Sequence, residues 1–214
     1  MSDTSPPRLT RRAILAAGLA LPATQAFAAN GQVVTILGDS ITAGFGLPAK
    51  DALPAQLHQA LLKMGVANVV RGAGVSGDTT LGGAARVDFS VQPDTEVCIV
   101  ALGGNDLLRG LDTTATRTNL DRILRRLKQR RMGVILAGLK APPEIGGGYV
   151  RDFNAIFPSL AKTYGVALYP DLLAGVARNR LLNQGDGIHP NAQGVQIIVK
   201  GLAPVVARAL KARA

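Results

Sequence analysis

The stretch Val33-Val34-Thr35-Ile36-Leu37-Gly38-Asp39-Ser40 decides the fold. Its first five residues are all apolar or β-branched, without the polar alternation of a strand that has one face in water. This pattern predicts a strand buried on both faces, and Gly38 marks the point where that strand ends. Ser40 is therefore expected at the carboxyl end of the first strand, among small residues.

Further apolar runs predict strands, and the segments between them predict helices. The expected strands are residues 33–37, 68–71, 96–102, 133–138 and 166–169. The expected helices are residues 53–64, 79–87, 114–130, 149–164 and 192–212, the last kinked or divided at Pro204. Strands that alternate with helices predict one parallel sheet covered on both faces. Such sheets carry their sites in the loops that follow the carboxyl ends of the strands.

The chain has 214 residues, a length that suits one domain with a substantial core. No repeat, low-complexity linker or change in composition divides residues 29–214, so we expect a single domain there. Aromatic residues make up only 4% of the chain and Trp is absent, so stacking surfaces for bases or sugars are scarce. The single cysteine, Cys98, can form no internal disulfide, and its apolar neighbours indicate a buried hydrophobic residue.

Residues 1–28 have the features of an export signal. Three arginines precede an apolar run over residues 13–21, which is shorter than the roughly 20 residues that a membrane span needs. Ala26-Phe27-Ala28 matches a small-residue cleavage site, and the paired arginines resemble a twin-arginine signal. We therefore predict cleavage near Ala28 and Ala29 and a periplasmic or secreted product.

The formal net charge is +10, and basic side chains concentrate in the helix expected over residues 114–130. Apolar residues in that segment recur at the spacing of one buried helical face, so the basic residues fit a solvated helix surface. Attraction to an anionic membrane surface is the alternative interpretation. Nucleic acid is not an expected partner, because the chain has no recognition motif and export would separate it from nucleic acid.

Ser40 needs a base to act as a nucleophile, and the chain contains only two histidines. His58 lies beside the buried stripe of the helix expected over residues 53–64, which indicates a solvated imidazole. His189 lies in a loop, three residues after Asp186. Asp186 can accept the Nδ1 proton of His189 and leave Nε2 free to take a proton from Ser40. A capping turn is the structural alternative, but a carboxylate beside the one usable histidine favours catalysis. A metal site is not expected, because the chain lacks a ligand cluster.

The loops after the next two strands offer hydrogen-bond donors for an oxyanion. Gly77 can supply an unobstructed backbone N–H and Asn105 a neutral side-chain amide, while the N–H of Ser40 itself would point into the same site. A tight turn at Gly77 and a helix cap at Asn105 are the structural alternatives. A nucleophile and two donors at three successive strand ends favour an acyl-transfer site.

Gly72 to Gly77 also spell G-x-G-x-x-G, the pattern of a dinucleotide-binding loop. That loop normally follows the first strand of its fold and opens a long helix, whereas here it follows the second strand and precedes a short helix. We therefore expect no dinucleotide cofactor. Ser76 in the same loop lacks the G-x-S-x-G spacing of a nucleophile, so Ser40 stays the candidate.

Four ordered motifs resemble the sequence blocks of the SGNH (GDSL) hydrolases: Gly38-Asp39-Ser40, Gly77, Gly103-Gly104-Asn105-Asp106 and Asp186-Gly187-Ile188-His189-Pro190. The strings around them are most similar to the bacterial periplasmic thioesterase and lysophospholipase subgroup. The resemblance implies a flavodoxin-like three-layer α/β/α sandwich with a five-stranded parallel sheet in the order 2-1-3-4-5. It further implies Ser40 as nucleophile, Asp186 and His189 as its partners, and an oxyanion hole formed by Ser40, Gly77 and Asn105.

The resemblance also implies small-molecule acyl esters and thioesters as substrates, without a cofactor. The chain departs from the family pattern at Ile41, where the name-giving motif has Leu, and at Gly146-Gly147-Gly148, in a loop that by the resemblance borders the acyl pocket. A carbohydrate-ester deacetylase on the same fold is the first alternative, although the apolar Ile145 and Leu107-Leu108 argue against the shallow polar site it needs. The second alternative is a non-catalytic module that binds a nucleotide or flavin.

Overall fold

Five parallel strands form the central sheet: β1 (Gln32–Gly38), β2 (Asn68–Gly74), β3 (Val97–Ala101), β4 (Gly133–Ala137) and β5 (Ala167–Tyr169). Their order is β2-β1-β3-β4-β5, which confirms the predicted topology. The computed structural model describes residues 1–2 and 31–213. All but the first two residues of the predicted export signal lie outside this part of the chain, so that signal stays a prediction.

The central position of β3 explains why its sequence is apolar throughout. Every residue from Val97 to Ala101 is buried, because helices cover both faces of the sheet at this strand. Cys98 is fully buried within it, and this burial raises the pKa of the thiol to about 12. The prediction that Cys98 is a buried hydrophobic residue is thus confirmed.

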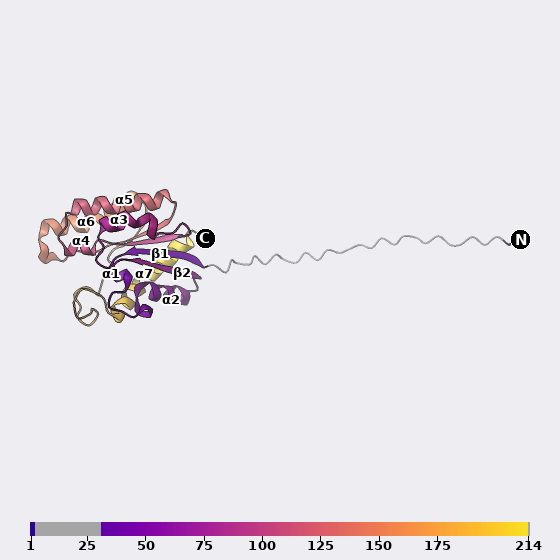
Figure 1. The fold of residues 1–214 in the computed structure, drawn as a ribbon, viewed down its shortest axis with the longest axis horizontal. Helices are drawn as coiled ribbons and strands as arrows, with labels where there is room; N and C mark the ends of the chain where they lie inside the picture. Colours follow the sequence, from indigo (N-terminus) through magenta and orange to yellow (C-terminus); the bar gives the residue numbers. More distant parts are fainter. Residues whose placement is uncertain (3–30, 214) are drawn as a thin grey trace.

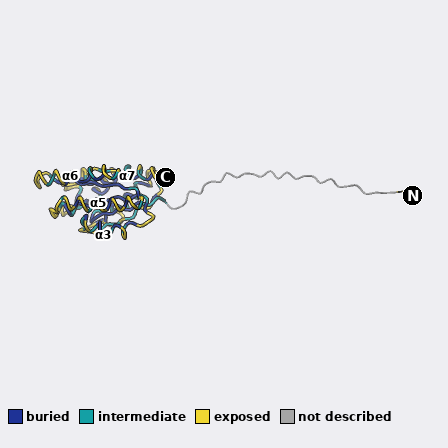
Figure 2. The backbone as a smooth tube through the Cα atoms, turned by 90° about the horizontal axis from the view of Figure 1, so that it is seen from above, coloured by how far each residue is buried: buried dark blue, intermediate teal, exposed yellow. Residues whose placement is uncertain are grey.

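Helices cover the sheet in two layers (Figure 1). One layer consists of α3 (Thr80–Ser90), α5 (Thr113–Gln129) and α6 (Gly147–Tyr164), with the short α4 (Gly104–Leu108) beside them. The other layer consists of α2 (Leu53–Lys63), α7 (Ala192–Lys211) and the short α1 (Ser40–Ala43). Two short 3-10 helices are η1 (Ala49–Asp51) and η2 (Pro143–Ile145). Figure 2, which looks onto the layer of α3, α5 and α6, shows buried and exposed residues alternating along the helices, as expected of helices with one face against the core.

The last helix is not divided at Pro204. α7 runs from Ala192 to Lys211 with Pro204 inside it, so of the two predicted outcomes, a kink or a division, the division does not occur. Proline removes one backbone hydrogen bond, but the residues around it, Leu202, Ala203 and Val206, are buried against the rest of the core. Tertiary packing of this face outweighs the local loss and keeps the helix continuous.

The second strand is three residues longer than predicted and ends at Gly74, which pairs with Gly38 of β1. A Cβ atom at Gly74 would lie 2.2 Å from the backbone nitrogen of Ala43, and one at Gly72 would lie 2.8 Å from the ring of Pro54. These glycines therefore allow α1 and the start of α2 to approach β2 closely. Two of the three glycines of the G-x-G-x-x-G pattern thus have a role in packing.

The basic helix α5 has the surface that its sequence predicted. Its apolar stripe is buried, and several of its charged side chains form ion pairs on the outside. Arg125 pairs with Asp121 at 2.6 Å, and Arg126 pairs with Asp88 of α3 at 2.7 Å. None of the helices in the described part of the chain is long and apolar enough to cross a bilayer.

Candidate active site

Ser40 lies where β1 turns directly into the short helix α1. Asp39 caps this helix, since its Oδ1 accepts the N–H of Ile41 at 3.1 Å. A Cβ atom at Gly38 would lie 2.1 Å from the hydroxyl of Thr42, so the turn requires glycine there. As the first helical residue, Ser40 has a backbone N–H without an intrahelical acceptor. The Gly-Asp-Ser sequence thus places both the hydroxyl and a free N–H at the carboxyl edge of the sheet.

His189 and Asp186 meet Ser40 from the loop ahead of α7. Nε2 of His189 lies 2.9 Å from Oγ of Ser40, and Nδ1 lies 2.6 Å from Oδ2 of Asp186. The other oxygen of Asp186 accepts the backbone N–H groups of Ile188 at 2.9 Å and of His189 at 3.0 Å. Gly187, between them, has a φ of +71°, a conformation that favours glycine in this tight loop. The structure therefore brings together the three side chains that the sequence predicted.

The charge of Asp186 determines how the imidazole is protonated. The hydrogen bond from His189, together with those from the two backbone N–H groups, lowers the pKa of Asp186 to about 2. The carboxylate is thus ionised at neutral pH and can only accept hydrogen bonds, so Nδ1 of a neutral His189 carries the proton. Nε2 then presents its lone pair to the hydroxyl of Ser40, as a general base requires.

Two residues that sequence reasoning missed hold the His189 loop in place. The ring of Phe45 packs against the imidazole of His189 with 4.6 Å between the ring centroids. Nε2 of Gln184 donates to the carbonyl of Phe45 at 2.8 Å and to that of Pro190 at 3.0 Å, which ties the loop to the segment after α1. About 140 residues of sequence separate Phe45 from this loop, so no local pattern could have indicated the contact.

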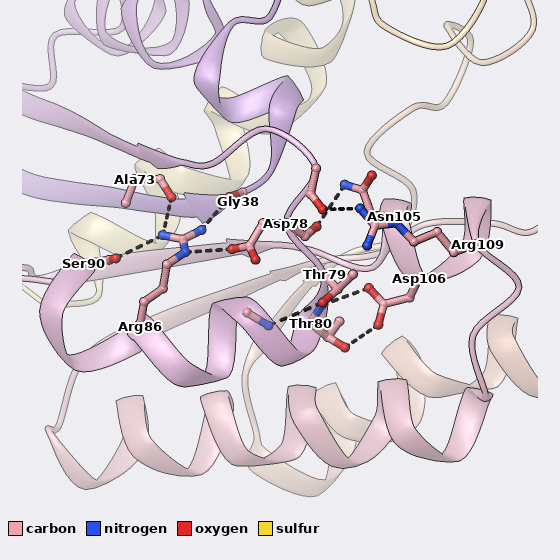
Figure 3. A network of polar contacts seen from close by, with 12 residues as sticks. Gly38, Ala73, Asp78, Thr79, Thr80, Arg86, Ser90, Asn105, Asp106 and Arg109 are labelled. Atoms are coloured by element: carbon pink, nitrogen blue, oxygen red, sulfur yellow. Dashed lines mark hydrogen bonds and ion pairs between the residues drawn. The ribbon is translucent and has the colours of Figure 1, made fainter.

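Of the predicted oxyanion donors besides Ser40, Asn105 contacts the loop that carries Gly77 through the carbonyl of Asp78 (Figure 3). Gly77 has a φ of +80°, which favours glycine. Asn105 lies in the first turn of α4, and its Nδ2 donates to the carbonyl of Asp78 at 2.9 Å. That bond uses one of the two amide hydrogens of Asn105, and within the described residues the other meets no acceptor. Asn105 lines the same groove as Ser40, whereas Gly77 does not line it and connects to it through Asp78.

A buried carboxylate fixes the position of α4. Asp106 is almost fully buried and accepts the backbone N–H of Thr80 at 2.9 Å. Its other oxygen accepts the hydroxyls of Thr80 and Thr116. Asp106 therefore joins the starts of α3 and α5 to the helix that carries Asn105 (Figure 3). The sequence placed Asp106 inside a family motif but assigned it no contact.

A groove of about 540 Å³ opens beside Ser40, Asn105 and His189. Its walls are mainly apolar and include Ile41, Leu107, Leu108, Leu139, Leu172 and Leu173. The predicted contribution of Leu107-Leu108 is thus correct. Ile145 and the Gly146-Gly147-Gly148 run are not among the lining residues; the run instead forms the start of α6 and the turn before it. Pro142 and Pro143, just before them, form that part of the wall.

Asp39 is a second ionisable group beside the nucleophile. Its side chain is buried in the wall of the groove, and this burial raises its pKa to about 6. The hydrogen bond from Ile41 and the charge of His189 oppose that shift. The sequence placed Asp39 in the Gly38-Asp39-Ser40 motif but assigned its side chain no role.

His58 does not take part in the site. It does not line the groove, and its Nδ1 lies 2.9 Å from Oδ1 of Asn68 at the start of β2. The imidazole is therefore half-buried and hydrogen-bonded rather than fully solvated as predicted, because Asn68 lies within reach of the helix surface. Across residues 31–213, no three His, Cys, Asp or Glu side chains cluster as a metal site would require.

A serine hydroxyl, an imidazole and a carboxylate joined in series, at the carboxyl edge of a doubly wound parallel sheet, define the class of α/β serine hydrolases. Comparison with known proteins identifies the family within this class. Residues 36–197 match the GDSL-like lipase/acylhydrolase family, and the chain belongs to that family.

Relatives and solved structures agree with this assignment. The chain is 32% identical to esterase TesA of Pseudomonas aeruginosa, over 84% of this chain and 90% of that protein. It is 36% identical to thioesterase 1/protease 1/lysophospholipase L1 of Escherichia coli, over 82% of this chain and 84% of that protein. Among solved structures, AlinE4, an SGNH-hydrolase family esterase, is 43% identical with a TM-score of 0.71, over 85% of this chain and 97% of AlinE4. The TesA crystal structure is 30% identical with a TM-score of 0.79, over 83% of this chain and 99% of TesA.

Proposed function

We propose that this chain hydrolyses acyl esters and thioesters through an acyl-enzyme formed on Ser40. One observation carries the proposal: Ser40, His189 and Asp186 are linked at 2.9 and 2.6 Å, at the mouth of an apolar groove. The relatives named esterase and thioesterase support the same substrate class.

The first half-reaction transfers the acyl group to the enzyme. Nε2 of His189 takes the hydroxyl proton while Oγ of Ser40 attacks the carbonyl carbon, and the carbonyl oxygen becomes an oxyanion. The N–H of Ser40 and the amide of Asn105, which line the groove, donate to that oxyanion, and the N–H of Gly77 is the third donor that the family resemblance implies. When the tetrahedral intermediate collapses, the protonated His189 gives its proton to the departing alkoxide or thiolate. Asp186, ionised throughout, stabilises the imidazolium.

The second half-reaction releases the acid and restores the enzyme. A water molecule replaces the leaving group, His189 takes one of its protons, and the hydroxide attacks the acyl-enzyme. The same donors stabilise the second oxyanion. Collapse breaks the bond to Ser40, whose oxygen recovers the proton from His189, and the fatty acid leaves.

The groove determines which acyl chains are accepted. Its leucine-rich walls and its volume of about 540 Å³ suit an alkyl chain longer than acetyl. Each methylene buried in such a groove contributes up to about 0.8 kcal/mol. We therefore expect kcat/KM for p-nitrophenyl octanoate to exceed that for the acetate by at least about tenfold. A clear preference for acetate would instead favour the carbohydrate-ester deacetylase, and a Ser40→Ala variant with undiminished hydrolysis would overturn the proposal.

We also propose that residues 1–28 direct export, on the basis of their sequence pattern alone. N-terminal sequencing of the periplasmic or secreted product should give Ala29 as its first residue. A mature chain that still begins at Met1 would refute this. Replacing Arg11-Arg12 by two lysines should block export if the twin-arginine route is used, whereas the Sec route would tolerate the change.

Besides the acyl substrate, an anionic membrane surface is a second proposed partner. Arg122 and Lys128 project from the exposed face of α5, but Arg125 and Arg126 on the same face are already paired with carboxylates. Sedimentation with vesicles of anionic and of neutral lipid tests it, and equal binding to both would remove the proposal.

A further inference from the structure

Arg86 of α3 joins the ends of two strands to the loop that follows β2 (Figure 3). Its Nη2 donates to the carbonyl of Gly38 at 2.8 Å, and its Nη1 donates to the carbonyl of Ala73 at 2.9 Å and the hydroxyl of Ser90 at 3.0 Å. Its Nε donates to Oδ2 of Asp78 at 2.7 Å. Gly38 precedes Ser40 by two residues, so one guanidinium contacts the backbone that carries the nucleophile and the loop that carries Gly77.

The ion pair between Arg86 and Asp78 is shielded from solvent. The side chains are only 18% and 11% exposed, whereas the paired side chains of Arg126 and Asp88 are 45% and 58% exposed. A Cβ atom at position 82 would lie 1.8 Å from Oδ1 of Asp78, so Gly82 makes room for the carboxylate against the first turn of α3. Because the ion pair is shielded, breaking it would leave a charge without a partner at high cost in free energy. The pair and the hydrogen bonds of the guanidinium therefore hold Arg86 and Asp78 in one geometry.

Asp78 connects Arg86 to Asn105. The main-chain carbonyl of Asp78 accepts a hydrogen bond from the side-chain amide of Asn105 at 2.9 Å. The main-chain N–H of Asp78 donates to the carbonyl of Val75 at 3.1 Å, which closes a tight turn around Gly77. The orientation of the Asn105 amide therefore depends on where the Asp78 backbone lies. The ion pair of the Asp78 side chain with Arg86 and the hydrogen bond to Val75 together fix that position.

We infer that Arg86 is a positioning residue for the oxyanion hole, and that it acts through Asp78 on the amide of Asn105. This inference rests on the proposed function, because it requires Asn105 to donate to an oxyanion. An oxyanion donor acts mainly on the transition state, so a small displacement of the amide lowers kcat more than it changes KM. Lysine at position 86 keeps a positive charge beside Asp78 but lacks the planar fork that reaches Gly38 and Ala73 at the same time.

The first experiment compares Arg86→Lys with a matched control. Arg126→Lys alters an exposed ion pair that involves the same helix, α3, and should leave kcat and KM for p-nitrophenyl octanoate unchanged. Arg86→Lys should lower kcat by about tenfold with KM within about twofold of wild type. Rates are expressed per site that reacts with a fluorophosphonate, so that unfolded protein does not enter the comparison. An unchanged kcat, or a raised KM with kcat unchanged, would overturn the inference.

The second experiment is a double-mutant cycle that combines Arg86→Lys with Asn105→Ala. If Arg86 had only a general structural role, the effects of the two substitutions on kcat would be independent of each other. Once the Asn105 amide is gone, Arg86→Lys should lower kcat by less than about threefold, because the group it positions is absent. An equal loss of kcat in both backgrounds would contradict the inference. Asp78→Asn removes the ion pair and keeps the main-chain carbonyl, so it replaces Arg86→Lys in the same cycle if the latter does not fold.

Measuring wild type and Ser40→Ala alongside distinguishes a failure of the proposed hydrolase function from a failure of the proposed role of Arg86. Ser40→Ala with wild-type activity would mean that the proposed function has failed. An inactive Ser40→Ala together with a strictly additive cycle would mean that only the role of Arg86 has failed.

Discussion

Replacing Asp186 by asparagine tests how the imidazole is oriented. Oδ1 of Asp186 accepts two backbone N–H groups, and Oδ2 accepts Nδ1–H of His189. The single oxygen of asparagine is retained by the backbone donors, so its NH₂ group faces Nδ1. Nδ1 must then accept a hydrogen bond, which places the proton on Nε2 and removes the lone pair that faces Ser40. We expect kcat to fall by a factor on the order of 10⁴, which corresponds to about 5 kcal/mol of activation free energy.

The assay for Asp186→Asn is the steady-state hydrolysis of p-nitrophenyl octanoate. Ser40→Ala, which lacks the nucleophile, gives the background rate. Asp112→Asn is the matched control, because Oδ1 of Asp112 accepts the N–H of Thr114 at the start of α5 in a similar short turn, far from any imidazole in sequence. That control should retain wild-type kcat. If Asp186→Asn kept kcat within tenfold of wild type while its fold was intact, the tautomer argument would be refuted.

Three further predictions follow from the same geometry. Asn105→Ala should lower kcat by about 10²–10³ with little change in KM, and a raised KM with level kcat would instead make Asn105 a binding residue. The kcat/KM of the wild type should rise with pH as the base of the free enzyme loses its proton; His58→Gln should leave this profile unchanged, and His189→Gln should abolish activity. The pKa of Asp186, lowered to about 2 in the folded protein, means that its ionised form stabilises the fold above its unfolded pKa and that this contribution is lost as pH falls through about 2. The Tm of wild type should therefore exceed that of Asp186→Asn near pH 6, and the two should converge near pH 2; a constant difference would contradict this.

The sheet could be predicted because the amino-acid sequence of most strands is itself typical of a buried strand. β3 is apolar throughout, β1 is apolar or β-branched from Val33 to Leu37, and the segments between strands have helical periodicity. The short helices α1 and α4 were missed, since four or five residues are too few to show a period and both contain small or polar residues. The extension of β2 to Gly74 was missed because glycine normally indicates a turn, whereas here it permits close contact between layers.

The candidate site also contains residues that could be predicted from the sequence and residues that could not. Ser40, Asp186 and His189 could be found from sequence because each lies in a short motif at a predicted strand end or loop. Arg86 and Gln184 could not, because their partners come from other parts of the chain and only the folded structure brings them together. The raised pKa of Asp39, likewise, depends on burial that neighbouring residues in sequence do not reveal.

In the proposed reaction, Ser40 forms the covalent acyl-enzyme. Reaction of the mature protein with a fluorophosphonate, followed by peptide mass spectrometry, identifies the modified residue directly. We predict one adduct per chain on the peptide that contains Ser40, and none in Ser40→Ala or after heat denaturation of the wild type. An adduct on another serine, such as Ser76, or undiminished labelling of Ser40→Ala would contradict the account.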